Sequence, residues 1–519
     1  MFVSSKIAIL LSVVANYCYG YRILVVFPVP GKSHSILGEG YVRHLLAAGH
    51  EVTYITPVPM KEPPPRLRQV DVSENLKYLA VDEMFDIKQL MTKLDNIQEY
   101  MPFHKAMENM MYQTYQLPVL QRFINDPKER YDVAVVEWLY SELSAGFSTV
   151  FNCPYIWASS MIPHTAVLSL IDTHVNPAYS VDHLSFHYTT TFWDRLEHWR
   201  FITKLTYYRW STRNEFDEKM KNVFGAATVK RGNRLPHFDD VRYNASLMLG
   251  NSHAVTGDRI ALPENYKHIG GYHMKEVDEP LPKDLQKLMD ESKNGVIYFS
   301  MGTMLKSSRI PDHIKRNLLN MFGELKQTVI WKLEQVIPDV PKNVHVTTWA
   351  PQQSILGHPN CILFITHGGL LSIMETLSAG VPIIGMPFYA DQFLNSERAE
   401  ARGFGMRIDF DENVAESLRV AIKEMVENPS YRQRVEELSP IFKNNIVTPG
   451  QQLSYWVEYV IKTKGAFHLR SPALQVSWYK TIHLDLALVL LLGVILCFKL
   501  CECLFRLVRK GESPKKKRS

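Results

Sequence analysis

The chain contains few cysteines, six in 519 residues. One lies in an N-terminal stretch that we expect to be removed and three lie in an apolar C-terminal segment, which leaves Cys153 and Cys361 in the body. Two cysteines cannot supply the disulfide framework of a small secreted scaffold. No cluster of cysteine and histidine has the spacing of a zinc site. The sequence therefore gives no reason to expect a disulfide-held fold or a structural metal.

The body of the chain also lacks an excess of basic residues. The whole chain has a net charge of +5, and residues 499–519 hold eight Lys and Arg against Glu502 and Glu512, a net charge of +6. Subtracting this tail from +5 leaves −1 for the rest of the chain. Nucleic-acid-binding domains usually carry a basic patch or stripe. We therefore expect no nucleic-acid partner.

A dinucleotide motif of the form GxGxxG is missing near the N-terminus, where only Gly38-Glu39-Gly40 occurs. This disfavours an oxidoreductase that binds a nicotinamide or flavin dinucleotide there. The segments nevertheless have α/β character, because residues 21–28 and 50–56 are apolar runs typical of buried strands and residues 36–49 predict a helix. Strand, helix and strand in this order predict an open α/β domain, with ligand loops at the carboxyl ends of its strands.

The length and composition predict more than one such domain. The chain is 46% hydrophobic and 21% charged, which is typical of a globular protein, and 519 residues require at least two domains. Further buried strands are predicted at residues 131–137, 154–159, 246–252, 295–301, 328–333, 344–349, 361–366 and 381–387. We expect a first α/β domain at residues 21–270, a linker at 271–294 and a second α/β domain at 295–465, with a juxtamembrane stretch at 466–483.

Both ends of the chain carry targeting signals. Residues 1–20 contain Lys6, an apolar core and Gly20 near the expected cut, as in a signal peptide. Residues 484–505 are apolar and predict one transmembrane helix. The basic tail at residues 506–519 then predicts a single-pass type I protein with a lumenal body and a short cytosolic tail.

Two shorter signals agree with this placement. The last four residues, Lys516-Lys517-Arg518-Ser519, fit the dilysine type of signal that returns membrane proteins to the endoplasmic reticulum. Asn244-Ala245-Ser246 is the only sequon, and it predicts glycosylation of Asn244 in a lumenal protein.

The most informative stretch begins at residue 361. An apolar run is followed by the turn His367-Gly368-Gly369, by a helix over residues 370–379 and by Gly380, which ends that helix. The first amides of such a helix lack partners and face the positive end of its dipole, so this turn predicts an anion site. Ser372 adds a hydroxyl, and Glu375 follows on the same face about 4.5 Å further along the axis. A phosphate near Ser372 would leave Glu375 facing the hydroxyls of an attached ribose.

The whole stretch resembles the signature of the UDP-glycosyltransferases over about 45 residues. The residues that carry the resemblance are Trp349, Gln352, His358, Thr366-His367-Gly368-Gly369, Glu375, Pro382, Pro387 and Asp391-Gln392. The resemblance implies the GT-B fold, in which two facing Rossmann-like domains enclose a cleft, here followed by a C-terminal transmembrane helix. It implies transfer of a sugar from a UDP-sugar with inversion at the anomeric carbon. The UDP-sugar is a co-substrate, and neither a cofactor nor a metal is expected.

The resemblance also implies a catalytic base in the first strand-end loop. We expect that loop at residues 28–35, and His34 within it matches the family's catalytic histidine. The family usually pairs this histidine with an aspartate near residue 137. This chain offers Glu137, with Asp132 as an alternative partner.

The implied donor site lies in the second domain. Ser300, Gly302, Thr303, His367, Gly369 and Ser372 would hold the diphosphate without a metal. Trp349 would stack on uracil near Gln352, Glu375 would bind ribose, and Asp391 and Gln392 would bind sugar hydroxyls. The sequence Asp409-Phe410-Asp411 is formally a metal-binding DxD, but Asp411 fits better as the N-cap of a helix at residues 412–427.

The acceptor and the sugar are less specified. Leu371-Ser372 after the turn is more similar to the insect branch, which favours glucose, and glucuronate is the alternative sugar. We expect a small lipophilic acceptor such as a phenol, steroid or xenobiotic, as in detoxification. Aromatic residues between 160 and 245 predict an acceptor pocket or a membrane-facing surface, and residues 83–125 predict helices beside a cleft. A different class, an inactive binding or regulatory protein of the membrane, stays open, as does homo-oligomerisation.

Overall fold

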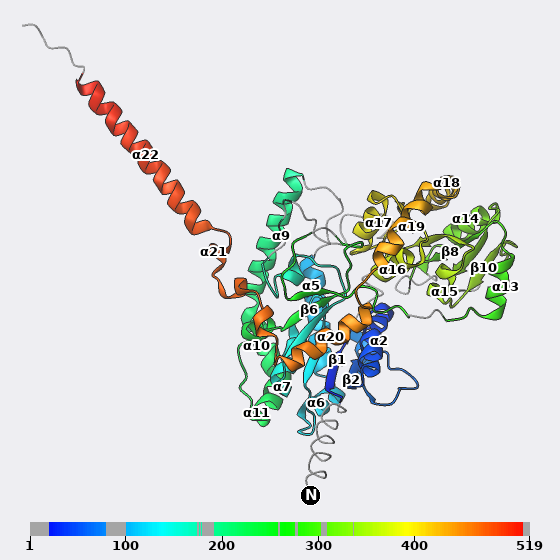
Figure 1. Ribbon diagram of the computed structural model, residues 1–519, viewed down its shortest axis with the longest axis horizontal. Coiled ribbons are helices and arrows are strands. Elements are labelled where there is room, and N and C mark those ends of the chain that lie inside the picture. Colours follow the sequence, from blue (N-terminus) through cyan, green and yellow to red (C-terminus); the bar gives the residue numbers. More distant parts are fainter. Residues whose placement is uncertain are drawn as a thin grey trace, which may run out of the picture. The chain divides into compact units, whose positions relative to one another are not determined.

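A computed structural model describes residues 20–78, 100–173, 176, 178, 191–257, 260–275, 279–302, 309–335 and 337–511. It contains two all-parallel β-sheets, each covered by helices on both faces (Figure 1). The predicted signal peptide up to residue 19, Thr303 and the last eight residues with the dilysine sequence lie outside the described residues.

The first sheet has seven strands in the order β3-β2-β1-β4-β5-β6-β7. Parallel pairing with crossovers on both sides of β1 is the doubly wound arrangement expected from alternating strands and helices. Its strands are β1 (Arg22–Val26), β2 (Glu51–Thr56), β3 (Leu67–Asp71), β4 (Val133–Trp138), β5 (Tyr155–Ser159), β6 (Leu247–Gly250) and β7 (Tyr266–His268).

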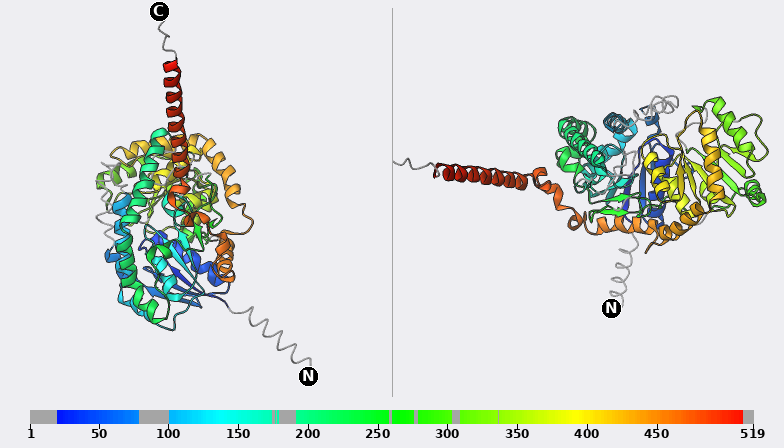
Figure 2. Two further views of the ribbon diagram at one scale, coloured as in Figure 1. Left: turned by 90° about the vertical axis from the view of Figure 1, so that its left-hand side faces the viewer. Right: turned by 90° about the horizontal axis from the view of Figure 1, so that it is seen from above.

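Successive strand residues point to opposite faces of this sheet, so Ile23 and Val25 contribute to one core and Leu24 and Val26 to the other. One face packs on α2 (Lys32–Ala47) and α20 (Pro449–Lys462), which lie beside each other in Figure 2. The other face packs on η1 (Ser73–Tyr78), α5 (Tyr100–Tyr115), α6 (Pro118–Asn125), η2 (Leu143–Ala145), α7 (Gly146–Phe151), α8 (Thr165–Leu168), α9 (Phe192–Ser211), α10 (Arg213–Met220), η3 (Lys221–Gly225), α11 (Ala226–Lys230) and α12 (Phe238–Arg242).

The second sheet has six strands in the order β10-β9-β8-β11-β12-β13. They are β8 (Val296–Ser300), β9 (Thr328–Lys332), β10 (Val344–Thr347), β11 (Cys361–Thr366), β12 (Ile383–Gly385) and β13 (Gly405–Arg407). One face packs on α14 (Asp312–Gly323) and α18 (Val414–Glu427). The other packs on α13 (Lys283–Glu291), α15 (Gln352–Gly357), α16 (Leu370–Ala379), α17 (Gln392–Ala401) and α19 (Ser430–Lys443).

Two helices pack against a different part of the fold than the predicted domain boundaries suggest. The stretch assigned to the linker contains α13, whose Met289 is buried in the core of the second sheet. The last helix of the stretch assigned to the second domain, α20, packs instead on the first sheet through Leu453, Val457 and Val460.

The described residues 471–511 form a second unit. The unit before it ends with η5 (Phe467–Leu469), and this one contains η6 (Pro472–Gln475), α21 (Trp478–Thr481) and α22 (Leu484–Gly511). Within α22, Leu484–Arg509 is long and apolar enough to cross a membrane, and its most apolar part is not buried. The apolar helix fits a single-pass anchor. It continues beyond residue 505, the last residue of the predicted transmembrane helix.

Candidate active site

His34 lies in the first turn of α2, directly after the carboxyl end of β1. The sequence placed His34 in a loop and began the helix at residue 36, which is wrong, because α2 begins at Lys32. Gly31 has extended backbone at the N-cap, and its carbonyl accepts the Ser35 N–H at 3.0 Å. The first helical hydrogen bond therefore already spans His34, and a regular helix positions its side chain.

Glu137 reaches His34 from the neighbouring strand. β4 pairs with β1, with Val136 opposite Val26, so the carboxyl ends of the two strands lie together. The Glu137 side chain is fully buried, and its Oε1 lies 2.5 Å from Nδ1 of His34. Asp132 lies at the other end of β4, where its Oδ2 accepts the Arg22 N–H at 2.7 Å. Of the two carboxylates considered, the structure brings only Glu137 to His34.

This contact determines which ring nitrogen of His34 can act as a base. An ionised carboxylate only accepts hydrogen bonds, so Nδ1 carries the hydrogen and Nε2 carries the lone pair. The His34 side chain is 19% exposed, whereas Glu137 is not exposed at all. The pair can take a proton at Nε2, and the buried carboxylate can stabilise the resulting imidazolium.

Ser160, which sequence reasoning missed, completes the surroundings of Glu137. It follows β5, the strand beside β4, and its hydroxyl donates to Oε1 of Glu137 at 2.6 Å. The other carboxylate oxygen is buried and has no hydrogen-bond partner among the described residues. A serine just after a predicted strand next to the strand of Glu137 was the available signal.

Two turns of the second domain lie close together at the predicted phosphate site. Ser300 ends β8 opposite Thr366, the last residue of β11. Gly302 has a φ of +77°, and a Cβ there would lie 2.6 Å from the imidazole of His367. Gly368 has a φ of +81°, which residues other than glycine rarely adopt. The glycines thus allow the loop after β8 to lie against the turn that opens α16 at Leu370.

His367 is an uncharged histidine within this site. Burial, with a smaller contribution from the cation of Lys332, lowers the pKa of His367 to about 4. Its Nδ1 is buried and has no hydrogen-bond partner among the described residues. Lys332, at the carboxyl end of β9, donates to the carbonyl of Gly302 at 2.9 Å. Sequence reasoning missed this cation, although a lysine that ends a buried strand was visible.

Glu375 and Ser372 lie on one face of α16, as their spacing predicts. The side-chain amide of Gln352 donates to both, at 3.0 Å to Ser372 Oγ and 2.5 Å to Glu375 Oε2. Gln353, which was not predicted, donates to Glu375 Oε1 at 3.3 Å. Trp349 precedes these glutamines, and its side chain is 61% exposed. Its indole is therefore available for stacking.

Asp391 and Gln392 lie where β12 leads into α17. Asp391 occupies the N-cap position, but its side chain does not cap the helix. Asn395 donates to Asp391 Oδ2 at 2.9 Å and to the carbonyl of Gly368 at 3.1 Å, so Asn395 links Asp391 to the phosphate turn. The side-chain oxygen of Gln392 accepts the backbone N–H of Phe388 at 2.9 Å and that of Tyr389 at 3.3 Å, and the residue is buried.

The formal DxD sequence has local roles. Asp409 accepts a hydrogen bond from Arg407 at 3.2 Å, and Asp411 accepts the backbone N–H of Asn413 at 2.8 Å. The N-cap of α18 is Asn413, so the prediction that Asp411 caps this helix is wrong. Among the residues that the structure describes, no three His, Cys, Asp or Glu side chains are grouped to hold a metal ion.

Two further predicted features lie away from these residues. Asn244 is exposed and accepts a hydrogen bond from Arg470, whereas Ser246 of the same sequon is buried. Five large aromatic side chains of the 160–245 region are exposed on α9, namely Phe192, Trp193, Trp199, Tyr207 and Trp210. This favours a surface role for these five over a place inside a pocket, while Phe186 and Tyr188 lie outside the described residues.

Comparison with known proteins decides the family. The sequence model described as "UDP-glucoronosyl and UDP-glucosyl transferase" matches residues 22–517. The chain belongs to this family. It is 30% identical over 489 residues to UDP-glucosyltransferase 2 of Dactylopius coccus, covering 93% of this chain and 92% of that protein. It is 35% identical over 260 residues to the rat 2-hydroxyacylsphingosine 1-beta-galactosyltransferase, covering 50% of this chain and 47% of that protein.

Solved structures agree with the two-sheet architecture. A UDP-glucosyltransferase from Polygonum tinctorium superposes with a TM-score of 0.55 and 15% identity, covering 85% of this chain and 99% of that chain. At this identity the likeness concerns the fold alone. Together with the two parallel sheets, it confirms the predicted GT-B fold. This member of the UDP-glycosyltransferases therefore uses a UDP-sugar donor and an acceptor.

Proposed function

We propose that this UDP-glycosyltransferase transfers glucose from UDP-glucose to the hydroxyl of a small lipophilic acceptor, with inversion at the anomeric carbon. His34 Nε2 takes the acceptor proton while the acceptor oxygen attacks the anomeric carbon, and UDP leaves with the electrons of the broken bond. Glu137 keeps Nδ1 protonated and stabilises the imidazolium. The observation that carries this proposal is the 2.5 Å contact between His34 Nδ1 and the buried Oε1 of Glu137.

Residues of the second domain form the proposed donor site. The leaving diphosphate lies against Ser300, Gly302, His367 and the first amides of α16 at Gly369–Ser372, where aligned N–H groups stabilise developing negative charge. A neutral His367 can donate one hydrogen bond without holding a second proton. Thr303 belongs to the same loop by sequence. Glu375 accepts the ribose hydroxyls, Trp349 stacks on uracil, and Asp391 and Gln392 bind the sugar.

Glucose is the proposed sugar because Leu371-Ser372 follows the insect pattern and the insect relative above is named a glucosyltransferase. Glucuronate and galactose are the competing sugars, since the family description includes the former and the rat relative is named for the latter. Purified protein should be incubated with each UDP-sugar and pooled phenol and steroid acceptors, and products identified by mass spectrometry. Glucosides from UDP-glucose support the proposal, and conjugates from UDP-glucuronate alone contradict the choice of glucose.

We further propose that the body lies in the lumen of the endoplasmic reticulum, anchored by α22. The apolar span Leu484–Arg509 and the basic residues after it support this orientation. Glycosylation of Asn244 would also follow from a lumenal body.

The incubation with UDP-sugars and pooled acceptors also tests the alternative of an inactive binding protein. Such a protein would bind UDP-glucose without releasing UDP in the presence of any acceptor.

A further inference from the structure

A short segment of the first domain lies directly against the helix that carries Glu375. We call residues 270–275 the crossover segment, because they follow β7 and contact both α2 and α16. A Cβ on Gly270 would lie 2.6 Å from the carbonyl of Ser252 and 2.9 Å from the methyl of Met374, the residue before Glu375. The carbonyl of Ser252 therefore excludes a side chain at Gly270, and the backbone of this residue lies against the Met374 side chain of α16.

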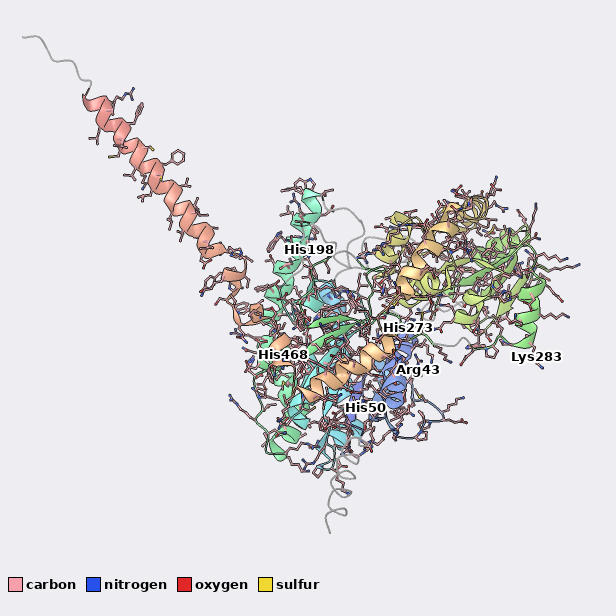
Figure 3. The ribbon with its side chains drawn as sticks, in the orientation of Figure 1. Arg43, His50, His198, His273, Lys283 and His468 are labelled. Carbon is pink, nitrogen blue, oxygen red and sulfur yellow. The ribbon has the colours of Figure 1, made fainter. Side chains whose placement is uncertain are left out.

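Helix α2 binds the backbone of the crossover segment from the other side. One guanidinium nitrogen of Arg43 lies 2.9, 3.2 and 3.0 Å from the carbonyl oxygens of Tyr272, His273 and Met274, to which it donates. His44 Nε2 lies 2.8 Å from the Tyr272 carbonyl. Arg43 and His273 are labelled close together in Figure 3. Helix α2 thus carries His34 in its first turn and binds the crossover segment through residues near its C-terminal end.

Two contacts link the crossover segment to Glu375. Nε2 of His273 lies 3.5 Å from Oε1 of Glu375, and the His273 side chain is fully buried. Neither ring nitrogen of His273 has a hydrogen-bond partner among the described residues. Gln353 forms a second link, because it accepts the Lys275 N–H at 3.1 Å and donates to the same Glu375 oxygen.

An unpaired buried imidazole is unfavourable unless it gains a partner in another state of the protein. Oε1 of Glu375 lies 3.5 Å from His273 Nε2, slightly further than in a hydrogen bond. A carboxylate has about four acceptor positions, enough for the glutamines and for further donors. A small movement of Glu375 toward His273 would pair the imidazole with the carboxylate and leave other acceptor positions of the carboxylate for a ribose.

We propose that His273 is a positioning residue for the UDP-sugar donor. Its Nε2–H donates to Glu375 Oε1 and holds the carboxylate in the orientation that accepts the ribose hydroxyls. Because Arg43 binds the His273 carbonyl from α2, the same contact fixes the helix of His34 relative to the donor. This inference rests on the assignment of Glu375 to ribose in the proposed function.

The test is the affinity for UDP measured by calorimetry on the full-length protein. His273→Ala weakens UDP binding about tenfold, the loss expected for one hydrogen bond to a charged group. In a Glu375→Ala background, the added His273→Ala change causes no further loss, since its effect passes through the carboxylate. His273→Gln, whose amide reaches the Nε2 position, retains most of the affinity, whereas the shorter His273→Asn does not.

His50 supplies a matched control. It is also a buried histidine beside a carboxylate, 3.3 Å from Glu458, but it joins the first sheet to α20. His50→Ala should leave UDP affinity unchanged, which separates a specific effect from the loss of any buried histidine. Thermal unfolding of each variant shows whether it is folded, and the Gln and Asn pair carries the test if His273→Ala does not fold.

The outcomes distinguish this inference from the function on which it rests. Unchanged UDP affinity in His273→Ala beside a weakened Glu375→Ala overturns the role of His273 alone. An equal loss from His273→Ala with and without Glu375 also overturns it, because a structural effect would act in both backgrounds. Unchanged affinity in Glu375→Ala overturns the ribose assignment and the role of His273 together.

Discussion

His34 Nδ1 lies 2.5 Å from Glu137 Oε1, although 103 residues separate them in the sequence. The contact exists because β1 and β4 are neighbours in the sheet, so that the turn after one meets the end of the other. It leaves the lone pair of His34 on Nε2 for an acceptor proton.

Replacing Glu137 tests whether this contact supports catalysis. Glu137→Ala should reduce kcat by less than His34→Ala does, since the carboxylate orients the base and stabilises its charged form. The double variant should be little worse than His34→Ala, because groups that act as a unit give non-additive losses. Asp132→Asn is the matched control, and its turnover should match the wild type. Steady-state kinetics of the four variants decide this, and additive losses would contradict the pairing.

Glu375→Ala tests the nucleotide site. Two hydrogen bonds from ribose hydroxyls to one carboxylate should contribute about 2–4 kcal/mol together, because each contributes about 1.5–3 and they are not additive. UDP affinity should fall by that amount in calorimetry. Glu416→Ala, a change at an exposed carboxylate on α18, should leave it unaltered. A folded Glu375→Ala with wild-type UDP affinity would refute the assignment.

Asp391 should bind the sugar rather than the nucleotide. Its side chain does not cap α17 and instead accepts a hydrogen bond from Asn395, which also binds the phosphate turn. Asp391→Ala should therefore impair turnover of UDP-glucose much more than binding of UDP. Parallel measurements of kcat/KM for UDP-glucose and of the UDP Kd separate the two. A similar loss in both would indicate that Asp391 only supports the turn.

The orientation of the anchor is tested with sealed microsomes. If α22 spans the membrane with the body inside, added protease should remove only the basic C-terminal tail. An antibody against the body should then detect a product shortened by about the length of that tail. Digestion of the body in intact vesicles, with a lumenal marker protected, would contradict the proposed orientation.

The continuous apolar strands and the glycine turn were predictable from the sequence because they have strong local signals. β4, β8, β9 and β11 each have a buried apolar centre, although Glu137 lies in β4 and Lys332 ends β9. Gly380 ends α16 in the left-handed conformation, as expected. Three edge strands, β3, β7 and β13, were not predicted, because β7 and β13 have only three residues each and β3 is less buried, whereas the edge strand β10 was predicted. In β3, the sequence LRQVD has one buried residue, Val70, since only one of its edges pairs with a neighbour.

Contacts that depend on tertiary structure could not be predicted. His34 was expected in a loop because Pro28, Pro30 and Gly31 are turn residues, yet the helix starts directly after Gly31. Ser160 has only its place just after a predicted strand as a local signal, and His273 has none. Sheet order brings Ser160 to Glu137, and the crossover segment brings His273 to Glu375. The sequence offered Glu137 and Asp132 as partners for His34. The pairing of β1 with β4 places Glu137 beside His34 and Asp132 at the opposite end of the strand.

The most direct test of the account is the turnover of His34→Ala on an alcohol acceptor of high pKa, with UDP affinity measured on the same protein. An acidic phenol is unsuitable because it is partly ionised and needs no base. Loss of a general base typically lowers the rate about 10²–10⁴-fold, or about 3–5 kcal/mol. The account predicts a loss in this range with unchanged UDP affinity. Retention of more than about a tenth of wild-type turnover would contradict the assignment of His34 as the base, because such a loss is below the usual range.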